Sequence, residues 1–345
     1  MQLIDVLPQH RFDDASLWRY LAAALPGFTQ PATLRQFQGG QSNPTFLIET
    51  ATGRVVLRKK PPGRLLPSAH LVEREYRVMK ALAQGAVPVP NVRLLCTDDA
   101  VIGTAFYVMD FVDGRVPSSV TLPDCSRIER GRIYDDMARV LAAIHSVDWR
   151  NCGLHDFGKP ERYLARQLDR WTRQYLASRT GEDAAMASLI GWLQQNLPVD
   201  DDASLVHGDY RLGNLILHAT EPRIIAVVDW ELATLGAPIG DLAYTCMSYR
   251  IPPGHALSGL AAENLAALGI PSEDEFIASY CRYAGRARPD HWAFYLAFSF
   301  FRMAAITQGV YARAQQGNAA DRRAVEHGRV ARLAAELGWS IAQSA

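Results

Sequence analysis

The most informative part of the chain reads Leu205-Val206-His207-Gly208-Asp209-Tyr210-Arg211-Leu212-Gly213-Asn214-Leu215, and further along it reads Val227-Val228-Asp229-Trp230-Glu231. The spacing is H-x-D-x-x-x-x-N followed by a second Asp. Phosphoryl transfer requires one carboxylate that accepts a hydroxyl proton and oxygen ligands that hold Mg²⁺ against the phosphates. The pattern therefore predicts Asp209 as a catalytic base, with Asn214 and Asp229 as Mg²⁺ ligands, in an ATP-dependent kinase.

Strands flank this motif. Leu215 to His218 and Ile224 to Trp230 are strand-like and are joined by the turn Ala219-Thr220-Glu221-Pro222, so a hairpin returns Asp229 close to Asn214. The alternative is that Asp, Asn and Gly are ordinary turn residues here. The whole set, with its paired strands and second Asp, favours the kinase site over that alternative.

The wider pattern predicts an α+β protein with two lobes. Before residue 113 it indicates a small antiparallel sheet with one covering helix, and after it a mainly helical region, so the predicted lobes are 1–112 for the nucleotide and 113–345 for catalysis and the acceptor. The predicted strands are Leu34 to Gln38, Thr45 to Glu49, Val55 to Arg58 and Ala105 to Val112. The predicted helices are Asp14 to Leu25, His70 to Gln84, Arg127 to His145, Pro160 to Ser178, Ala184 to Leu197, Ser272 to Tyr283 and Trp292 to Arg313.

Composition excludes several classes of function. The 345 residues are 48% hydrophobic and carry no formal net charge, so no global field favours nucleic acid or an anionic membrane. The five cysteines are scattered without a C-x-x-C pair, which is typical of reduced thiols. The first residues lack the basic-then-apolar pattern of a secretion signal, and a cytoplasmic location is expected.

The motifs together resemble the aminoglycoside phosphotransferase family, which includes choline and homoserine kinases. The resemblance covers roughly residues 30 to 310 and rests on His207-Gly208-Asp209 with Asn214, on Asp229-Trp230-Glu231 and on Gly240-Asp241-Leu242-Ala243. It implies a bilobal protein-kinase-like fold that uses ATP and Mg²⁺. Asp241 and His207 would support the catalytic loop. Protein kinases carry a regulatory Arg where Gly208 stands, so its absence implies a constitutively competent enzyme.

The nucleotide loop is expected at Gln38-Gly39-Gly40-Gln41-Ser42-Asn43, which resembles the Gly-Gly-x-Ser-Asn loop of this family. Backbone N–H groups there could close over the phosphates, with Gly39, Gly40, Ser42 and Asn43 as binding residues. A glycine pair between strands is also an ordinary turn. Further along, the connector between the lobes would hydrogen-bond adenine through the backbone around Asp110 to Val112.

A cation on the next strand should contact the α- and β-phosphates. Strand alternation places Arg58 and Lys60 on one face and Lys59 on the other, and the V-A-I-K pattern favours Arg58 with Lys60 as second choice. Glu73 and Glu75 follow on the predicted helix. By resemblance Glu75 is the partner of Arg58, although either glutamate could simply face solvent.

The phosphate acceptor is less constrained by the sequence. From Tyr280 to Arg332 there are nine arginines against three acidic residues, which disfavours a polycationic aminoglycoside and suggests an anionic acceptor. The arginines are Arg282, Arg286, Arg288, Arg302, Arg313, Arg322, Arg323, Arg329 and Arg332. A solvated helix face is the alternative explanation.

The run from Leu57 to His70 resembles the kinase-like domain associated with acyl-CoA dehydrogenases of the ten/eleven type. That resemblance implies a hydroxyacyl-CoA as substrate and a functional link to an acyl-CoA dehydrogenase. A kinase of another small alcohol (an antibiotic, a sugar, choline or a homoserine-like compound) and a catalytically silent nucleotide-binding module remain open. The aromatic residues between Trp292 and Phe301 could shape an acyl pocket, but their helical spacing favours a core.

Overall fold

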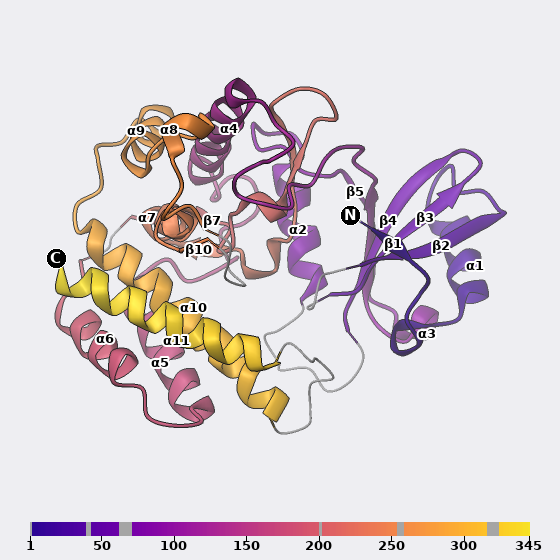
Figure 1. Ribbon diagram of the computed structural model, residues 1–345. Coiled ribbons are helices and arrows are strands. Elements are labelled where there is room, and N and C mark those ends of the chain that lie inside the picture. The colour runs from indigo at the N-terminus through magenta and orange to yellow at the C-terminus, as the bar shows by residue number, and fades with distance from the viewer. Residues whose placement is uncertain (1, 39–42, 62–70, 200–201, 254–258, 316–323) are drawn as a thin grey trace. The chain divides into compact units, whose positions relative to one another are not determined.

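The computed structural model describes residues 2–38, 43–61, 71–199, 202–253, 259–315 and 324–345. The chain divides into two compact units (Figure 1). Unit 1 comprises Met1–Val116, Cys152–Leu154 and Gly213–Ala233, and unit 2 comprises Pro117–Asn151, His155–Leu212 and Thr234–Ala345. The predicted lobes, 1–112 and 113–345, are a different division because unit 1 takes two segments from later in the chain; as lobes they stay a prediction.

Unit 1 is built on an antiparallel sheet with the strand order β1-β2-β3-β4-β6-β5. The four strands that the sequence predicts form its centre, and β1 and β5 add the two edges. The strands are β1 Leu3–Ile4, β2 Ala32–Phe37, β3 Thr45–Thr50, β4 Gly53–Lys59, β5 Val92–Cys96 and β6 Phe106–Asp110. The α-helices of this unit are α1 Asp14–Ala24, α2 Val72–Leu82 and α3 Asp99–Ile102.

Both faces of this sheet are covered. On one face the side chains of α1 and α3 share a core with strand residues that include Phe46, Leu57 and Val108. On the other face lies α2, the covering helix that the sequence predicts, whose Glu75 is hydrogen-bonded to Tyr107 of β6. Side chains alternate along a strand, so Arg58 points away from the face of Leu57 and toward the face that α2 covers.

A second hairpin completes unit 1. It pairs β8 (Leu215–Leu217) with β9 (Ile224–Val227) in antiparallel fashion, as predicted, and the short 3-10 helix Trp230–Leu232 follows. The hairpin is tied to the rest of the unit by main-chain bonds: Arg115 bridges Leu217, and the N–H of Val227 donates to Pro88 O at 2.8 Å. These bonds hold the residues at its open end.

Unit 2 is mainly helical. Its α-helices are α4 Arg127–His145, α5 Tyr163–Ser178, α6 Ala184–Gln195, α7 Pro238–Cys246, α8 Leu265–Leu268, α9 Glu273–Ala284, α10 Trp292–Gln315 and α11 Ala324–Gln343. A two-stranded sheet pairs β7 (Ser204–Val206) with β10 (Thr234–Gly236). The bounds of α4 agree fully with the prediction, because Ser126 and Glu129 form a capping box at its start. The sequence reading did not identify α7 or α11.

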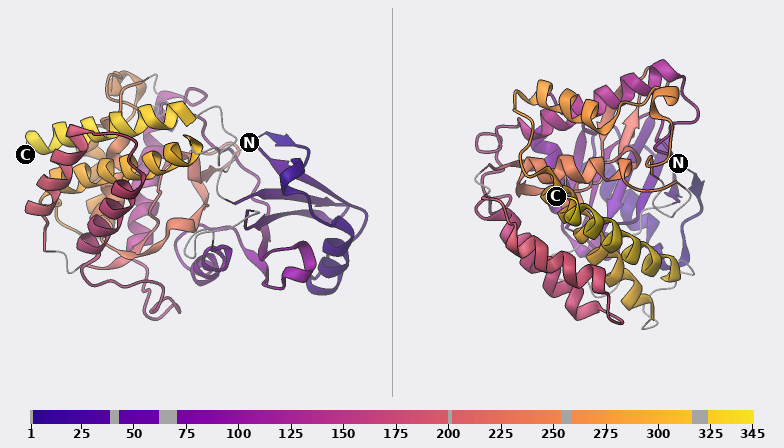
Figure 2. Two further views of the ribbon diagram at one scale, coloured as in Figure 1. Left: turned by 90° about the horizontal axis from the view of Figure 1, so that it is seen from below. Right: turned by 60° about the vertical axis from the view of Figure 1, so that its left-hand side comes forward.

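The long apolar helix α10 forms the centre of this unit. It lies beside α11 in both Figure 1 and Figure 2 and packs against α5 and α7. By length and composition it could cross a membrane. However, 67% of its most apolar 18-residue stretch is buried inside the protein, which is typical of a core helix. Its aromatic residues from Phe294 to Phe301 are buried, which supports the core interpretation over the acyl pocket.

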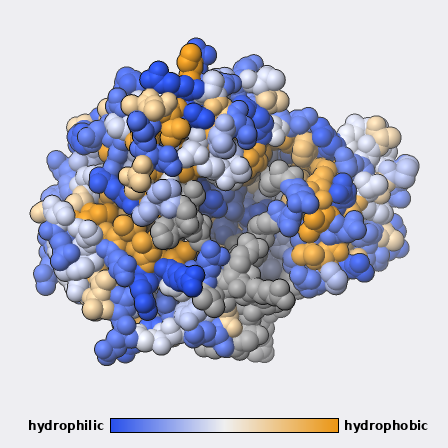
Figure 3. Space-filling view, viewed as in Figure 1, coloured by the Kyte–Doolittle hydropathy of each residue, from blue (hydrophilic) through white to orange (hydrophobic). Residues whose placement is uncertain are grey.

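The surface of the protein is mostly hydrophilic. Figure 3 shows hydrophilic side chains over most of the visible face, with hydrophobic side chains gathered over α10 and α11. The five cysteines have no disulfide partner, and four of them are buried. Buried thiols of this kind behave as small hydrophobic side chains.

Candidate active site

The predicted catalytic loop, in unit 2, is held by main-chain hydrogen bonds to one carboxylate. The N–H groups of His207 and Gly208 donate to the two oxygens of Asp241 at 2.7 and 2.8 Å. Gly208 has φ +82°, a left-handed conformation in which a residue with a Cβ would be strained. This backbone conformation therefore favours glycine at position 208. It gives a structural reason why the arginine that protein kinases carry here is absent.

Asp241 is itself buried and fully hydrogen-bonded. Besides the two amides, His145 Nε2 lies 3.3 Å from its carboxylate, and His145 Nδ1 lies 2.7 Å from the hydroxyl of Tyr280. A proton on Nε2 satisfies both contacts, since Tyr280 can then donate to Nδ1. Burial raises the pKa of Asp241, but hydrogen bonding to His145 and the backbone outweighs it, so the pKa lies below its usual value. The resemblance implied a supporting role for Asp241, and the geometry fits that role.

The predicted base, Asp209, is oriented by two side chains. Tyr244 donates its hydroxyl to Asp209 Oδ1 at 2.6 Å, and Arg211 Nε lies 3.2 Å from Oδ2. The Asp209 side chain is 18% exposed, so it is reachable from solvent. Burial, and then the neighbouring carboxylate of Asp209, raise the pKa of Tyr244 well above its usual value, which keeps it a donor. Tyr244 is not among the predicted site residues, because it lies 35 residues beyond Asp209 in the chain.

Arg302 of α10 connects this loop to the helical core. Its Nη2 donates to Gly208 O at 2.8 Å, and its guanidinium lies 5.4 Å from the ring centroid of Tyr244 and 5.8 Å from that of Trp171. Each distance is within the range of a cation–π contact. The sequence predicts Arg302 only as part of a positive region, but in the structure it contacts Gly208 and Tyr244, the residues that flank Asp209 in space.

In unit 1 the predicted ion pair is present. Arg58 lies 3.0 Å from Glu75 and 2.5 Å from Asp229, and it is almost fully buried. Burial opposes the charge on Arg58, but Glu75 and then Asp229 outweigh it and raise its pKa. Complete burial raises the pKa of Glu75, while Arg58 acts against that shift. The contact of either group with a nucleotide stays a prediction.

Two further side chains hold Glu75. Asn43 Nδ2 donates to it at 2.8 Å, and the hydroxyl of Tyr107 donates at 3.2 Å. The other end of the Asn43 amide, Oδ1, is buried and finds no donor among the residues that the structure describes. Buried acceptors are normally satisfied, so this oxygen suits a donor that lies outside the described residues, either in the rest of the chain or in a bound ligand. Gly39, Gly40 and Ser42, the rest of the predicted loop, lie outside the described residues.

The two predicted Mg²⁺ ligands flank the open end of the β8–β9 hairpin. The N–H of Val228 donates to Asn214 O at 3.0 Å, so Asp229 follows directly on the residue bonded to Asn214. Asp229 has φ +68°, a conformation that costs a non-glycine residue free energy and is found mainly where function requires it. Amide and carboxylate oxygens are the hard donors that Mg²⁺ prefers, so these residues fit that ion.

The boundary between the units falls between Leu212 and Gly213. Asp209 therefore belongs to unit 2, whereas Asn214 and Asp229 belong to unit 1. The convergence of all three on a single ion stays a prediction.

The remaining predicted nucleotide residues have other contacts. Lys60, the second choice for the phosphates, lies 2.5 Å from Glu73. The N–H of Asp110 donates to Asn91 O at 2.9 Å, and its carboxylate pairs with Arg93 at 2.6 Å. That N–H is thus already used within unit 1. The predicted adenine contact then depends mainly on Val112, which follows the last strand of the sheet.

Fewer arginines are available to an anionic acceptor than the sequence suggests. Three of the nine arginines form ion pairs on the surface of unit 2: Arg282 with Asp135, Arg286 with Asp202, and Arg288 with Asp274. Arg302 is used at the catalytic loop, and Arg322 and Arg323 lie outside the described residues. Among the described arginines of the set, Arg313, Arg329 and Arg332 have no carboxylate partner.

Comparison with known proteins identifies the family of this chain. The phosphotransferase enzyme family matches residues 33–298, which include every predicted site residue. The chain is 47% identical over 315 residues to mouse acyl-CoA dehydrogenase family member 10, covering 91% of this chain. It spans only 30% of the length of that relative.

Solved structures give the same family and fold. A Ralstonia eutropha protein, provisionally described as an aminoglycoside phosphotransferase, is 48% identical, with a TM-score of 0.88 over 97% of this chain and 99% of the other. Aminoglycoside phosphotransferase APH(4)-Ia, in a ternary complex with AMP-PNP and hygromycin B, has a TM-score of 0.60 at 18% identity, over 95% and 98% of the two chains. The second likeness shows the fold alone, the predicted protein-kinase-like bilobal α+β fold. With a family match over most of its length and a close relative of known structure, the chain belongs to the phosphotransferase enzyme family.

Proposed function

We propose that this phosphotransferase transfers the γ-phosphoryl group of ATP to a hydroxyl group of a small molecule, with Asp209 as the catalytic base. The observation that carries the proposal is the fixed geometry of the loop around Asp209. Both preceding amides are bonded to Asp241, and Oδ1 of Asp209 accepts the hydroxyl of Tyr244 at 2.6 Å. A pre-positioned carboxylate is what a hydroxyl acceptor needs.

Each polar group has a defined task in this proposal. Asp209 accepts the proton of the acceptor hydroxyl as its oxygen bonds to phosphorus and the bond from phosphorus to ADP breaks. Arg58, held by Glu75, neutralises phosphate charge on the nucleotide. Asn214 and Asp229 would hold Mg²⁺, which supplies positive charge against the phosphates when bound. The AMP-PNP complex of a protein with the same fold supports the use of ATP.

For the acceptor we favour a hydroxyacyl-CoA. The similarity to mouse acyl-CoA dehydrogenase family member 10 supports a link to acyl-CoA chemistry, and so do Arg329 and Arg332 of α11, which form no ion pair with another described residue. Phosphorylation converts a poor leaving group into a good one, so the product would suit a partner enzyme that eliminates phosphate. Glu182 and Asp183, which line a pocket of unit 2, favour the second candidate, a cationic alcohol such as an aminoglycoside.

The test is a substrate screen. The purified protein is incubated with ATP and Mg²⁺ and a panel of hydroxyacyl-CoAs, free hydroxy acids, choline, sugars and aminoglycosides, and ADP formation and the mass of the product are measured. We expect a phosphorylated hydroxyacyl-CoA as the main product. Asp209→Ala should lower kcat by roughly 10²- to 10⁴-fold, the usual contribution of a general base.

A matched control is Asp169→Ala, which removes an exposed carboxylate from α5 of the same unit. It should leave activity unchanged. Equal activity of Asp209→Ala and the wild-type protein would end the assignment of the base. Turnover of an aminoglycoside in place of every CoA thioester would select the second candidate, and ATP binding without any turnover would indicate a silent module.

A further inference from the structure

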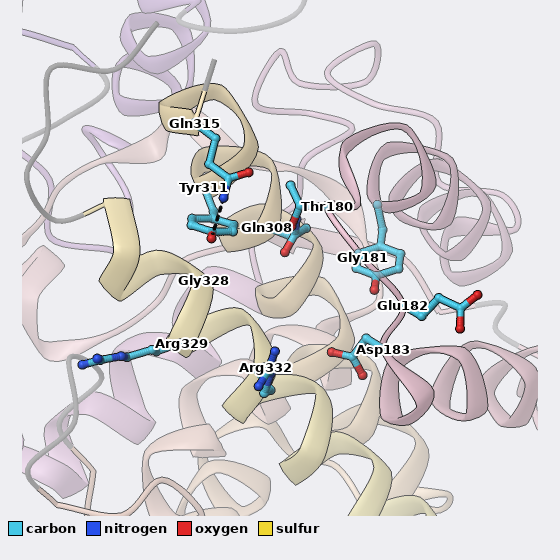
Figure 4. Close-up of a pocket in the computed structure, with 11 residues that line it drawn as sticks. Thr180, Gly181, Glu182, Asp183, Gln308, Tyr311, Gln315, Gly328, Arg329 and Arg332 are labelled. Atoms are coloured by element: carbon cyan, nitrogen blue, oxygen red, sulfur yellow. Dashed lines mark hydrogen bonds between the residues drawn. The ribbon is translucent and has the colours of Figure 1, made fainter. Parts of the chain in front are cut away.

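Unit 2 contains a pocket outside the catalytic loop. It has a volume of about 410 Å³, in the usual range for ligand sites, and lies between α10, α11 and the segment that joins α5 to α6 (Figure 4). Its walls include Tyr175, Gln308, Tyr311, Arg329 and Arg332. In Figure 4, Arg332 lies opposite Asp183, and Arg329 comes from the same helix but extends away from the other labelled side chains.

Fixed contacts shape this pocket. Gln308 of α10, only 9% exposed, donates to Ser178 O at 3.0 Å and lies 3.2 Å from Thr180 Oγ1, which ties α10 to the opposite wall. A Cβ on Gly328 would meet the ring of Tyr311 at 3.2 Å, so the glycine lets this ring lie against α11. The pocket is therefore defined by packed and hydrogen-bonded residues.

Its chemistry suits a phosphorylated nucleoside. Arg329 and Arg332 are one helical turn apart, and no ion pair or hydrogen bond joins either to another described residue. Guanidinium groups bind phosphate through paired N–H donors. Tyr311 is partly exposed and can offer one ring face to an aromatic base, while Tyr175, which is 8% exposed, contributes the part of its ring that reaches the pocket wall.

The acidic side of the pocket is compatible with the same ligand. Glu182 can accept hydrogen bonds from hydroxyl or amino groups. The carboxylate of Asp183 is already engaged at the start of α6, where it accepts from the N–H of Met186 at 2.9 Å. A bare anion would leave these acceptors unused, whereas a nucleoside has donors for them.

The pocket also lies along the helix that contacts the catalytic loop. Arg302, which donates to Gly208 O, precedes Tyr311 on α10, and a rise of 1.5 Å per residue separates them by about 14 Å along the axis. Trp171, below Arg302, and Tyr175, in the pocket wall, are one turn apart on α5. The pantetheine arm of coenzyme A is about as long as four residues of extended chain, roughly 14 Å.

We propose that this pocket binds the phosphorylated adenosine end of a CoA thioester, with the pantetheine arm following α10 toward Asp209. The proposal rests on the proposed function for the identity of the acceptor. It adds a specific site to that function, formed by Arg329 and Arg332 with the rings of Tyr175 and Tyr311.

The site can be tested by binding, without turnover. Coenzyme A is titrated into the full chain by calorimetry with AMP-PNP present at one equivalent, so that the nucleotide site is occupied without a large excess of an adenosine phosphate that could compete for the pocket. The variant Arg329→Gln/Arg332→Gln removes two exposed charges, and Arg132→Gln, an exposed residue of α4 outside the pocket, is the matched control. We expect the double variant to bind coenzyme A at least about tenfold more weakly, the loss of a charge-assisted hydrogen bond. The control should bind like wild type.

Each outcome decides the proposal. Equal affinity of the double variant and the wild type overturns it, as does a wild-type protein that does not bind coenzyme A. A protein that binds coenzyme A through these arginines but phosphorylates no hydroxyacyl-CoA retains the site and loses the proposed acceptor. Turnover of a hydroxyacyl-CoA with an unchanged KM in the double variant retains the function and rejects the site.

Discussion

Glu75 in unit 1 and Asp241 in unit 2 are both buried carboxylates beside predicted site residues, but different kinds of partner hold them. Glu75 is held by side chains, namely Arg58, Asn43 and Tyr107. Asp241 is held by the backbone amides of His207 and Gly208, together with His145. Burial raises the pKa of Glu75, whereas the hydrogen bonds of Asp241 overcome the same effect and lower its pKa.

The difference teaches what each carboxylate can do. Side-chain partners can change rotamer when a ligand binds, so under the proposed function the group around Glu75 would present the charge of Arg58 to the nucleotide. Backbone partners cannot move without moving the chain, so Asp241 fixes the conformation of the loop before Asp209. One carboxylate therefore positions a charge, and the other positions a segment of backbone.

The largest loss of unfolding free energy is expected from Glu75→Ala. It leaves Arg58 buried with Asp229 as its remaining carboxylate, and breaking a buried pair costs about 3 kcal/mol or more of unfolding free energy. Urea unfolding monitored by circular dichroism measures the loss. The double variant Arg58→Met/Glu75→Leu should recover part of it, because it removes the buried cation, although Asn43 and Tyr107 still lose their acceptor. A double variant as unstable as Glu75→Ala would contradict this account.

A smaller loss is expected from Asp241→Asn. The new amide turns its NH₂ group toward one of the two backbone donors, which costs about 2 kcal/mol at pH 7. The folded-state pKa of Asp241 is below the usual 3.8, so its stabilisation is complete above 3.8 and is lost as the pH falls through the folded value. The gap in Tm between wild type and variant should therefore narrow in that acid range.

The control for this pH dependence is Asp169→Asn. It alters a carboxylate that is 65% exposed, and its effect on Tm should be small at every pH. A gap for Asp241→Asn that stays constant on acidification would show that the charge of Asp241 does not stabilise the loop.

The smallest effect is expected from Lys60→Ala. The pair with Glu73 is short, 2.5 Å, and its side chains are 20% and 33% exposed, so solvent reaches it more than the Arg58–Glu75 pair and its loss should cost less unfolding free energy. Lys60→Ala should also raise the KM for ATP less than Arg58→Met does. The reverse order would make Lys60 the cation that contacts the phosphates.

Much of the fold followed from periodicity and capping. Long helices such as α4 were predicted because an amphipathic pattern and a capping box mark them. The strands β7 and β10 have three residues each, too few for a periodic signal, and were not predicted. The edge strand β5 and the helices α7 and α11 were also missed.

The candidate site also has a part that local sequence patterns predict and a part that they do not. Asp209 and Asn214 are close in sequence, and Arg58 and Glu75 lie on a strand and the helix that covers it, so local patterns identified them. The contacts of Asp209 with Tyr244, of Arg302 with Gly208, and of His145 with Asp241 join residues 35, 94 and 96 positions apart. Only the packing of α4, α7 and α10 brings these residues together, and a single sequence carries no local signal for it.

The interleaved division of the chain has a consequence for synthesis. A nascent chain leaves the ribosome from its amino terminus, and domains generally fold as they emerge. The amino-terminal sheet unit, however, includes Gly213–Ala233, whose hairpin bonds to Pro88 and Arg115. The folding of this unit can therefore be completed only after Ala233 has been translated. A fragment that stops at Val116 would lack the hairpin that completes the unit.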